Sequence, residues 1–412
     1  MSVPGAGVIV AGLLLDGTGG PGVEDAAILF DDGRIVAAGP ATAVLAHPAA
    51  ADARRRDLDT STLTPGLVDA HVHLAYGRPT DPGWPDMAPR PQGYSAWALA
   101  GAQSALSRGV TTVRDCGSPE GIALDVRRLL RTGLVRGARV LACGPCLTTS
   151  GGHGEFLGVT ADGTEELRAR LRDLAPQRPD AVKVMATGGS MDPHTDRRSA
   201  QYSTDELAAV VAEADRLGVQ VVAHANATEG IRRAVLAGVQ VIAHCNFLAA
   251  QDGRLDVDHE VIAEMAARKV YVDLNLGAAM VPLREVDARQ EPPEADVPED
   301  RWRLLRSLPE LAPRTFFTSD AFGPAVGDFP DLLAQAARRW QLSLAEVLWR
   351  ATGLPAEAMG KGATFGSLLP GRVADICVYD GDLRTDPDLL GSPQMVLQAG
   401  IPVAGPGRLA TR

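Results

Sequence analysis

Residues 65–365 alternate between two patterns of hydrophobic and polar positions. Short apolar runs rich in β-branched residues predict strands, and they lie at residues 67–70, 110–114, 139–142, 181–186, 219–223, 239–243, 270–274 and 314–318. Segments with helical spacing of apolar residues predict helices, at residues 95–108, 121–131, 165–174, 203–217, 228–237, 258–269 and 330–340. Eight successive strand–helix steps favour a closed (β/α)8 TIM-type barrel of parallel strands over an open, doubly wound sheet.

Both ends of the chain show a different pattern, with short strand-like runs in place of helices. These runs lie at residues 8–15, 26–30 and 34–39, and again at 375–379, 395–399 and 401–403. Asp-Gly pairs at residues 16–17 and 32–33 predict hairpin turns between the first runs. Residues 277–313, between the last two predicted barrel strands, are rich in proline and glutamate, so we expect a long surface excursion there.

The composition narrows the class of protein. Hydrophobic residues make up 45% and charged residues 22%, which is ordinary for a globular protein and excludes a disordered chain or a small disulfide scaffold. The net charge of −11 makes nucleic acid or an anionic membrane surface a poor partner, because both bind clustered positive charge. With five cysteines, no basic leader and no long apolar run, the chain is expected to be cytoplasmic, and a homo-oligomer is left open.

Four histidines close predicted barrel strands. His71 and His73 end the first strand at a spacing of two, which places both imidazoles on one face and within reach of one metal ion. Alone, this pair would be more typical of two hydrogen-bonded polar histidines. However, His224 and His244 end two near-identical runs, VQVVAH and VQVIAH. Since the active site of such a barrel lies at the carboxyl ends of its strands, all four are expected at one site.

Two charged residues occupy similar positions. Lys183 lies inside the apolar run AVKVM, where an unpaired ammonium is costly. Only three of the 40 lysines and arginines are lysines, so an amine is indicated here, and an amine can add CO₂ to form an anionic carbamate. The alternative is a lysine that extends past the strand end into solvent. Asp320 ends the run FFTSD, where a buried carboxylate needs a partner such as a metal ion.

Together these residues resemble the ligands of the amidohydrolase superfamily with a binuclear metal centre. The local sequence is similar to its imidazolonepropionase-related branch, which includes Xaa-Pro and Xaa-Arg dipeptidases. The similarity spans nearly the whole chain apart from about residues 277–313. It is carried by the segments LTPGLVDAH, GVTTVRD, GGHG, KVMATGG and LPGRVAD, at residues 63–71, 109–115, 151–154, 183–189 and 369–375.

The resemblance implies a fold and a set of roles. It implies a small β-sandwich domain built from residues 1–64 and 366–412, beside a barrel of residues 65–365. Two divalent metal ions would be bound, with zinc expected and manganese or cobalt as alternatives. The more buried ion would be held by His71, His73 and Asp320, the more exposed one by His224 and His244, and both by carboxylated Lys183 as a bridge. Asp320 would also carry a proton to the leaving amine.

Candidate substrate contacts follow the strand ends. His153 lies in a glycine-rich loop and is expected to contact the substrate carbonyl or the tetrahedral intermediate, with an ordinary loop histidine as the alternative. After the fourth strand, Arg197 or Arg198 would suit a substrate carboxylate, although a solvated charge run is the stronger alternative. The further candidates are Tyr202, Arg114 and Asn226.

We therefore expect a hydrolase that cleaves an amide-type C–N bond of a small molecule by attack of a metal-bridging hydroxide. A dipeptide or an N-acyl amino acid is the leading substrate, a carbamate, urea or cyclic amide is next, and an ester, lactone or phosphotriester would need the same centre. Asn226 and Cys245 depart from the residues common in the family, which leaves specificity open. Deamination ranks low because Glu229 does not fit the position of the acid in such enzymes.

Two other motifs lack the following helix that their usual function requires. Cys143 and Cys146 form a CGPC sequence typical of thioredoxin-like redox proteins, but the LTTSGG that follows cannot start a helix promptly, as thiolate stabilisation requires. The sequence GTGGPG at residues 17–22 fits a dinucleotide fingerprint but opens a hairpin instead of a helix. A redox or binding module is therefore ranked below a hydrolase.

Overall fold

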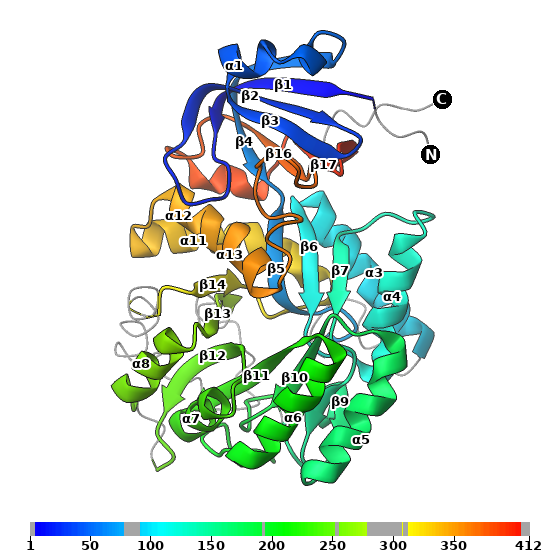
Figure 1. Cartoon of the computed structure of the whole chain (residues 1–412), viewed down its shortest axis with the longest axis vertical. Helices are drawn as coiled ribbons and strands as arrows, with labels where there is room; N and C mark the ends of the chain where they lie inside the picture. Colours follow the sequence, from blue (N-terminus) through cyan, green and yellow to red (C-terminus); the bar gives the residue numbers. More distant parts are fainter. Residues whose placement is uncertain are drawn as a thin grey trace.

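The computed structural model describes residues 5–77, 91–191, 194–251, 255–277, 307 and 312–404. The two ends of the described chain, blue and orange to red in Figure 1, lie side by side in one sheet in the upper part of the molecule. The middle of the chain forms the α/β part below it. No helix among these described residues is long and apolar enough to cross a membrane.

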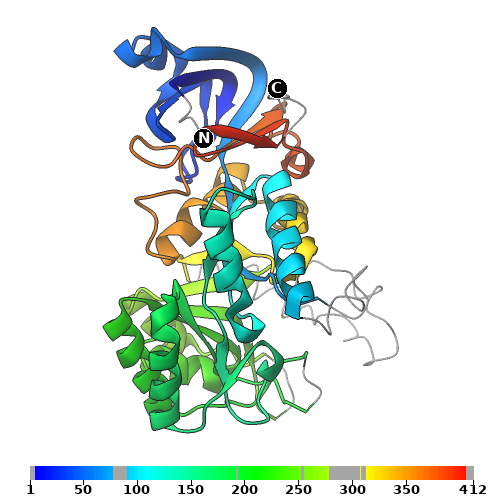
Figure 2. The same cartoon turned by 90° about the vertical axis from the view of Figure 1, so that its right-hand side faces the viewer.

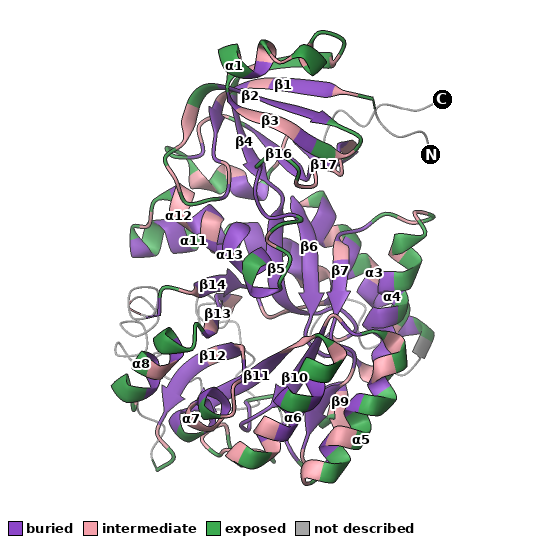
Figure 3. Cartoon of the chain, viewed as in Figure 1, coloured by how far each residue is buried: buried purple, intermediate pink, exposed green. Residues whose placement is uncertain are grey.

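The predicted barrel is confirmed, and neighbouring strands in its wall run parallel. Its strands are almost entirely buried (Figure 3). Hydrogen bonds of 2.9 Å from the amide of Asp180 to the carbonyl of Ala142, and from the amide of Asp320 to the carbonyl of His71, close the wall where the strands fall into two sheets. In chain order the strands are β5 (Leu67–His73), β6 (Val110–Asp115), β7 (Arg139–Ala142), β10 (Ala181–Met185), β11 (Gln220–Ala227), β12 (Val241–Leu248), β13 (Tyr271–Asn275) and β14 (Thr315–Thr318).

Helices surround the barrel wall, and each predicted helix is present. They are α3 (Pro91–Ser107), α4 (Ile122–Arg131), α5 (Thr164–Leu174), α6 (Thr204–Leu217), α7 (Thr228–Leu236), α8 (His259–Ala267) and α11 (Phe329–Trp340). The expected capping pattern of α6 is a full capping box, in which the side chains of Ser203 and Glu206 each accept a hydrogen bond from the other's backbone N–H.

The amino-terminal end of the barrel is closed by a helix that the sequence pattern did not predict, α13 (Gly353–Ala358), which follows α12 (Leu344–Arg350). Its residues Leu354 and Ala356 share one buried cluster with Val68 and Phe316 of the barrel strands. Apolar side chains fill this end of the barrel. The polar residues of an active site are therefore expected at the opposite end, where the strands have their carboxyl ends.

Strands from both chain ends form one seven-stranded sheet in the order β18-β17-β16-β4-β1-β2-β3. Figure 2 shows this sheet curled, with the red carboxyl-terminal strands lying across the blue amino-terminal ones. Ile9, Ile28, Ile376 and Leu397 share its core, so the sheet builds the expected β-sandwich beside the barrel. The strands are β1 (Gly7–Leu14), β2 (Val23–Asp31), β3 (Arg34–Pro40), β4 (Arg54–Pro65), β16 (Ile376–Asp380), β17 (Met395–Gln398) and β18 (Ile401–Ala404).

Strand β4 joins the two chain ends, because it pairs in parallel with β1 and antiparallel with β16. The sequence pattern missed it, since its first half is charged and exposed. The hairpin predicted at Asp32 and Gly33 is confirmed between β2 and β3. Both turn residues have positive φ, 46° and 71°, as a tight two-residue turn requires.

The predicted excursion at residues 277–313 lies mostly outside the described residues. The strands on either side of it, β13 and β14, are neighbours in the barrel wall.

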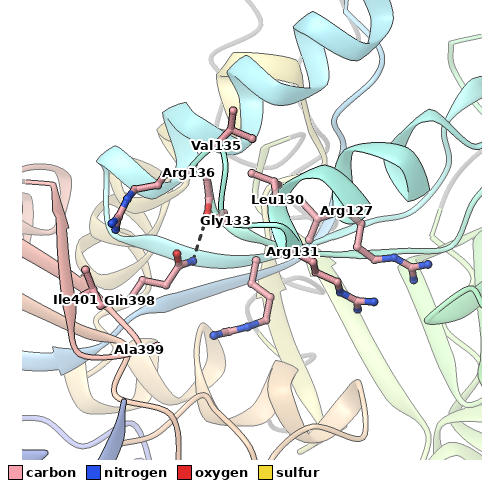
Figure 4. Close-up of a pocket in the computed structure, with 13 residues that line it drawn as sticks. Arg127, Leu130, Arg131, Gly133, Val135, Arg136, Gln398, Ala399 and Ile401 are labelled. Carbon is pink, nitrogen blue, oxygen red and sulfur yellow. Dashed lines mark hydrogen bonds between the residues drawn. The ribbon is translucent and has the colours of Figure 1, made fainter. Parts of the chain in front are cut away.

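A surface pocket of about 410 Å³ lies between the barrel and the terminal sheet (Figure 4). Its lining includes Arg127 and Arg139, which bind Asp180 and Asp375 through contacts of 2.5 and 2.7 Å. In Figure 4, Arg136 lies at one side of the pocket while Arg127 and Arg131 lie at the other. These arginines therefore do not converge on one point, and two of them hold neighbouring segments together.

Candidate metal centre

His71 and His73 lie at the end of β5 and face Asp320, which follows β14. Their Nε2 atoms are 3.4 and 3.3 Å from Oδ1 of Asp320. One ligand atom from each of the three residues lies within 4.8 Å of the other two. Two imidazoles and a carboxylate at this spacing are a donor set that divalent metal ions bind. The structure thus brings these three predicted ligands together.

Lys183 points from β10 toward the same group. Its Nζ lies 2.9 Å from Nε2 of His71, and 1% of the residue is exposed. Among the described residues, Lys183 makes no ion pair with a carboxylate. A buried amine without an anionic partner is unfavourable, so the position calls for a further anionic or metal partner.

His224 and His244 lie next to each other, and His244 lies beside His71. Their ring centroids are 4.5 Å apart, and that of His244 is 5.4 Å from that of His71. Burial lowers the pKa of both His224 and His244 well below the usual value, and the neighbouring His244, His153 and Lys183 lower the pKa of His224 further. The neutral imidazole is the form that binds a metal ion.

Asp320 remains ionised in this setting. Burial raises the pKa of Asp320, but His71, His73 and His244 lower it more, so that the pKa lies well below the usual range. Asn275, at the end of β13, donates from Nδ2 to Oδ2 of Asp320 at 2.6 Å. One carboxylate oxygen is thereby fixed, while the other faces the two histidines of β5.

A second layer of residues orients the ligands. Nδ1 of His71 lies 2.7 Å from Oδ2 of Asp273, whose other oxygen accepts a hydrogen bond of 2.5 Å from Oγ1 of Thr318. Nδ1 of His73 lies 3.1 Å from the carbonyl of Gly117. These partners favour the tautomer with the proton on Nδ1, which turns Nε2 of each histidine toward Asp320.

The carboxylate of Asp69 positions the loop that carries Asp320. It accepts hydrogen bonds from the backbone N–H and the hydroxyl of Ser319, at 3.1 and 2.5 Å. Burial raises the pKa of Asp69 to about 7 despite these hydrogen bonds. Sequence reasoning missed Asp69 and Asp273; the available signal was a carboxylate inside an otherwise apolar strand, which needs partners.

The metal-ligand group forms one wall of a cavity of about 110 Å³. His153 lines it, with its ring centroid 4.7 Å from that of His224, and so do Arg197 and Asn226. The pattern had not singled out the other lining residues, which are Leu157, Met185, Ser190, Met191, Asn246 and Asn275. The cavity therefore combines imidazoles, amides, one arginine and an apolar side.

Three predicted substrate contacts do not line this cavity. Arg114 is buried in the barrel, where its Nε donates to the carbonyl of Ala70 at 2.8 Å. The hydroxyl of Tyr202 donates to the carbonyl of Ala161 at 3.0 Å. Arg198 is bound to Asp196 at 2.8 Å. None of the three is among the described residues that line the cavity.

The structure also argues against a redox function of the CGPC motif. Cys143 and Cys146 are free, buried thiols, and Cys146 begins the short strand β8 (Cys146–Thr148). The chain after Cys143 continues into this strand, so Cys143 lacks the helix amino terminus that stabilises the reactive thiolate of a redox motif.

The chain belongs to the Amidohydrolase family, whose sequence profile matches residues 62–402. Its fold is the α/β fold of that family, as the motifs predicted. This assignment agrees with the ligands gathered at the carboxyl ends of the barrel strands.

Particular relatives differ in how much of the chain they match. Ochratoxinase of Aspergillus niger is 28% identical over 266 residues, which cover 56% of this chain and 52% of ochratoxinase, so the chain spans about half the length of that relative. Imidazolonepropionase of Nocardia farcinica is 26% identical over 364 residues, covering 87% of this chain and 86% of that protein. The solved structure of a prolidase complexed with N-methylphosphonate-L-proline matches with a TM-score of 0.78 at 26% identity, over 97% of this chain and 99% of that one.

Proposed function

We propose that this amidohydrolase is a binuclear enzyme that cleaves the amide bond of a dipeptide or an N-acyl amino acid. The observation that carries the proposal is the position of Lys183. Its amine lies 2.9 Å from Nε2 of His71, and Lys183 lines the same cavity as His224 and His244, so it is near both proposed groups of metal donors.

Carboxylated Lys183 would join the two groups. Addition of CO₂ to the neutral amine forms a new N–C bond and releases one proton, which converts Lys183 into an anion with two oxygen donors. Its neighbours support this form, because the described surroundings give the lysine no carboxylate partner. A bridging anion would offset the repulsion between two bound cations.

Zinc is the proposed metal, because imidazole and carboxylate ligands suit it. His71, His73 and Asp320 would hold one ion, His224 and His244 the other, and the ions would polarise the scissile carbonyl and lower the pKa of a bound water. Asp320 would accept the proton of that water and return it to the leaving amine. Asn275 keeps the carboxylate oriented for this transfer, through its 2.6 Å hydrogen bond.

Arg197 and His153 would position the substrate. Both line the cavity beside the metal ligands. A guanidinium suits a carboxylate, which both a dipeptide and an N-acyl amino acid possess. His153 would donate to the oxygen that becomes negative in the transition state. The prolidase relative, solved with a phosphonate of L-proline, supports a small substrate with a carboxylate.

A carbamate, urea, cyclic amide, ester or lactone hydrolase would use the same centre, and these remain the alternative. The arginine favours the amino-acid substrates over them. Replacing Arg197 with glutamine should therefore raise KM for N-acyl amino acids about 10-fold or more, in line with loss of a charge-assisted hydrogen bond. Arg198→Gln is the matched control, because Arg198 is bound to Asp196 outside the cavity lining.

The proposal is tested by hydrolysis assays on the zinc-reconstituted protein, with dipeptides, N-acyl amino acids, carbamates, phenylureas and esters. We expect cleavage of amino-acid amides to exceed that of analogues without the carboxylate, and the Arg197 variant to remove this preference. Cleavage restricted to esters or carbamates would overturn the substrate class. Equal effects of the Arg197 and Arg198 substitutions would remove the proposed carboxylate clamp.

A further inference from the structure

The chain contains only three asparagines, Asn226, Asn246 and Asn275. All three line the cavity beside the metal ligands. They come from the neighbouring strands β11, β12 and β13, near or at the carboxyl end of each. A residue type used nowhere else in 412 positions is thus concentrated at one site, which points to a function of the carboxamide group there.

Asn226 and Asn246 form a buried pair. Nδ2 of Asn246 donates to Oδ1 of Asn226 at 2.6 Å, and the residues are 7% and 8% exposed. The backbone N–H of Asn226 donates to Oγ1 of Thr187 at 3.0 Å, and its Nδ2 lies 2.9 Å from Nε2 of His224. The pair is therefore held in place next to a metal ligand before any substrate binds.

The backbone of β12 is strained where it presents Asn246. His244, Cys245 and Phe247 have φ values of 65°, 52° and 49°, a region that is unfavourable for residues other than glycine. The register of β12 against β11 shifts at the same place. His244 and Asn246, two residues apart at this strand end, both line the cavity, and such strain is typical of functional sites.

The pair presents both kinds of hydrogen-bonding group. Each carboxamide has one carbonyl acceptor and two N–H donors. The bond between Asn226 and Asn246 uses one acceptor and one donor, and within the described part of the chain no residue donates to the side-chain carbonyl of Asn246. Whichever way the two amides are turned, a bonded pair retains a free carbonyl and free N–H groups, and these complement an amide.

We propose that the free carbonyl of the Asn226–Asn246 pair accepts the N–H of a secondary amide at the scissile bond. The inference rests on the proposed amide hydrolysis and specifies the class of amide. A tertiary amide, such as an Xaa-Pro bond, or an ester has no N–H to donate. Such a substrate would cover this carbonyl without giving it a donor, so the enzyme selects secondary amides by about 10-fold or more.

The test uses calorimetric titration of the metal-free protein, which contains the pair but has no metal centre for turnover. The probes are N-acetyl-L-alanine and N-acetyl-N-methyl-L-alanine, which differ at the amide nitrogen. Asn246→Leu removes the carbonyl, whereas Asn246→Asp keeps an acceptor of the same size. Gln398→Leu is the matched control, because this amide lies in β17 and bonds to the carbonyls of Thr111 and Gly137, outside the cavity.

We expect the parent and Gln398→Leu to bind the N–H probe about 10-fold more tightly than the N-methyl probe. Asn246→Leu should lose this preference and Asn246→Asp should retain it. Equal binding of the two probes by the parent, binding of neither, or an unchanged preference in Asn246→Leu would overturn the inference. The preference could also be found in a protein whose zinc-loaded form cleaves no amide. That result would support the pair as the N–H acceptor and contradict the proposed amide hydrolysis.

Discussion

Replacing Asp273 with asparagine removes one charge behind the metal site while it preserves shape. Oδ2 of Asp273 lies 2.7 Å from Nδ1 of His71, and the two side chains are 0% and 1% exposed. The carboxylate is also held by Thr318, so an asparagine can occupy the same position. The substitution therefore isolates the charge of the hydrogen bond that orients His71.

The expected magnitude follows from this geometry. A buried hydrogen bond to a charged group contributes about 1.5–3 kcal/mol and a neutral one about 0.5–1.5 kcal/mol. The difference, about 1–1.5 kcal/mol, corresponds to roughly a 10-fold change in an equilibrium constant. We therefore expect zinc affinity to fall about 10-fold, at the lower end of the range for residues behind metal ligands.

The assay is competition for zinc between the metal-free protein and a chromophoric chelator, with urea unfolding measured in parallel to confirm the fold. Asp331→Asn is the matched control, because this carboxylate binds Arg108 at the surface, 49% exposed. Unchanged zinc affinity in a folded Asp273→Asn protein would refute the reasoning. An equal loss in both variants would show a general effect of charge.

Three further predictions concern the same centre. Cys143→Ser combined with Cys146→Ser should leave hydrolysis within a few-fold of the parent, because neither thiol lines the described cavity; a loss above about 100-fold would place them in the chemistry. Asp320→Asn should keep much of the metal but lose about 10²–10⁴ in turnover, more on alkyl amides than on nitroanilides; equal losses on both would exclude proton transfer to the leaving amine. Burial and a nearby ammonium lower the pKa of His71, but surrounding anionic groups raise it more, to about 9. Zinc must displace this proton, so its affinity should rise with pH up to about 9, and calorimetry that finds no proton release at pH 7 would contradict this.

The sequence was sufficient to predict the barrel and the grouping of His71, His73 and Asp320 because both depend on local patterns. Each barrel strand is an apolar run buried on both faces, and such runs are visible without tertiary information. His71, His224 and Asp320 each end or follow one of these runs, so the parallel topology alone brings them to one end of the barrel. The structure confirms that His71, His73 and Asp320 converge.

Features that depend on long-range packing could not be predicted in this way. β4 begins with charged residues and becomes a strand only because β1 and β16 flank it. The backbone strain at the end of β12 follows from no local rule. Arg114 ends a predicted strand and Tyr202 comes after another, but their side chains bond to backbone carbonyls elsewhere. Direction of a side chain at a strand end depends on such tertiary partners.

The central proposal is that Lys183 bridges two metal ions, and metal analysis of Lys183→Ala tests it most directly. Parent and variant are reconstituted with zinc in bicarbonate buffer, and the zinc per chain and the hydrolysis rate are measured on the same samples. We expect about two zinc ions per chain in the parent. The variant should lose most of its metal and activity, and a short carboxylic acid should restore part of both. A variant with the full metal content and the full rate would contradict the bridge.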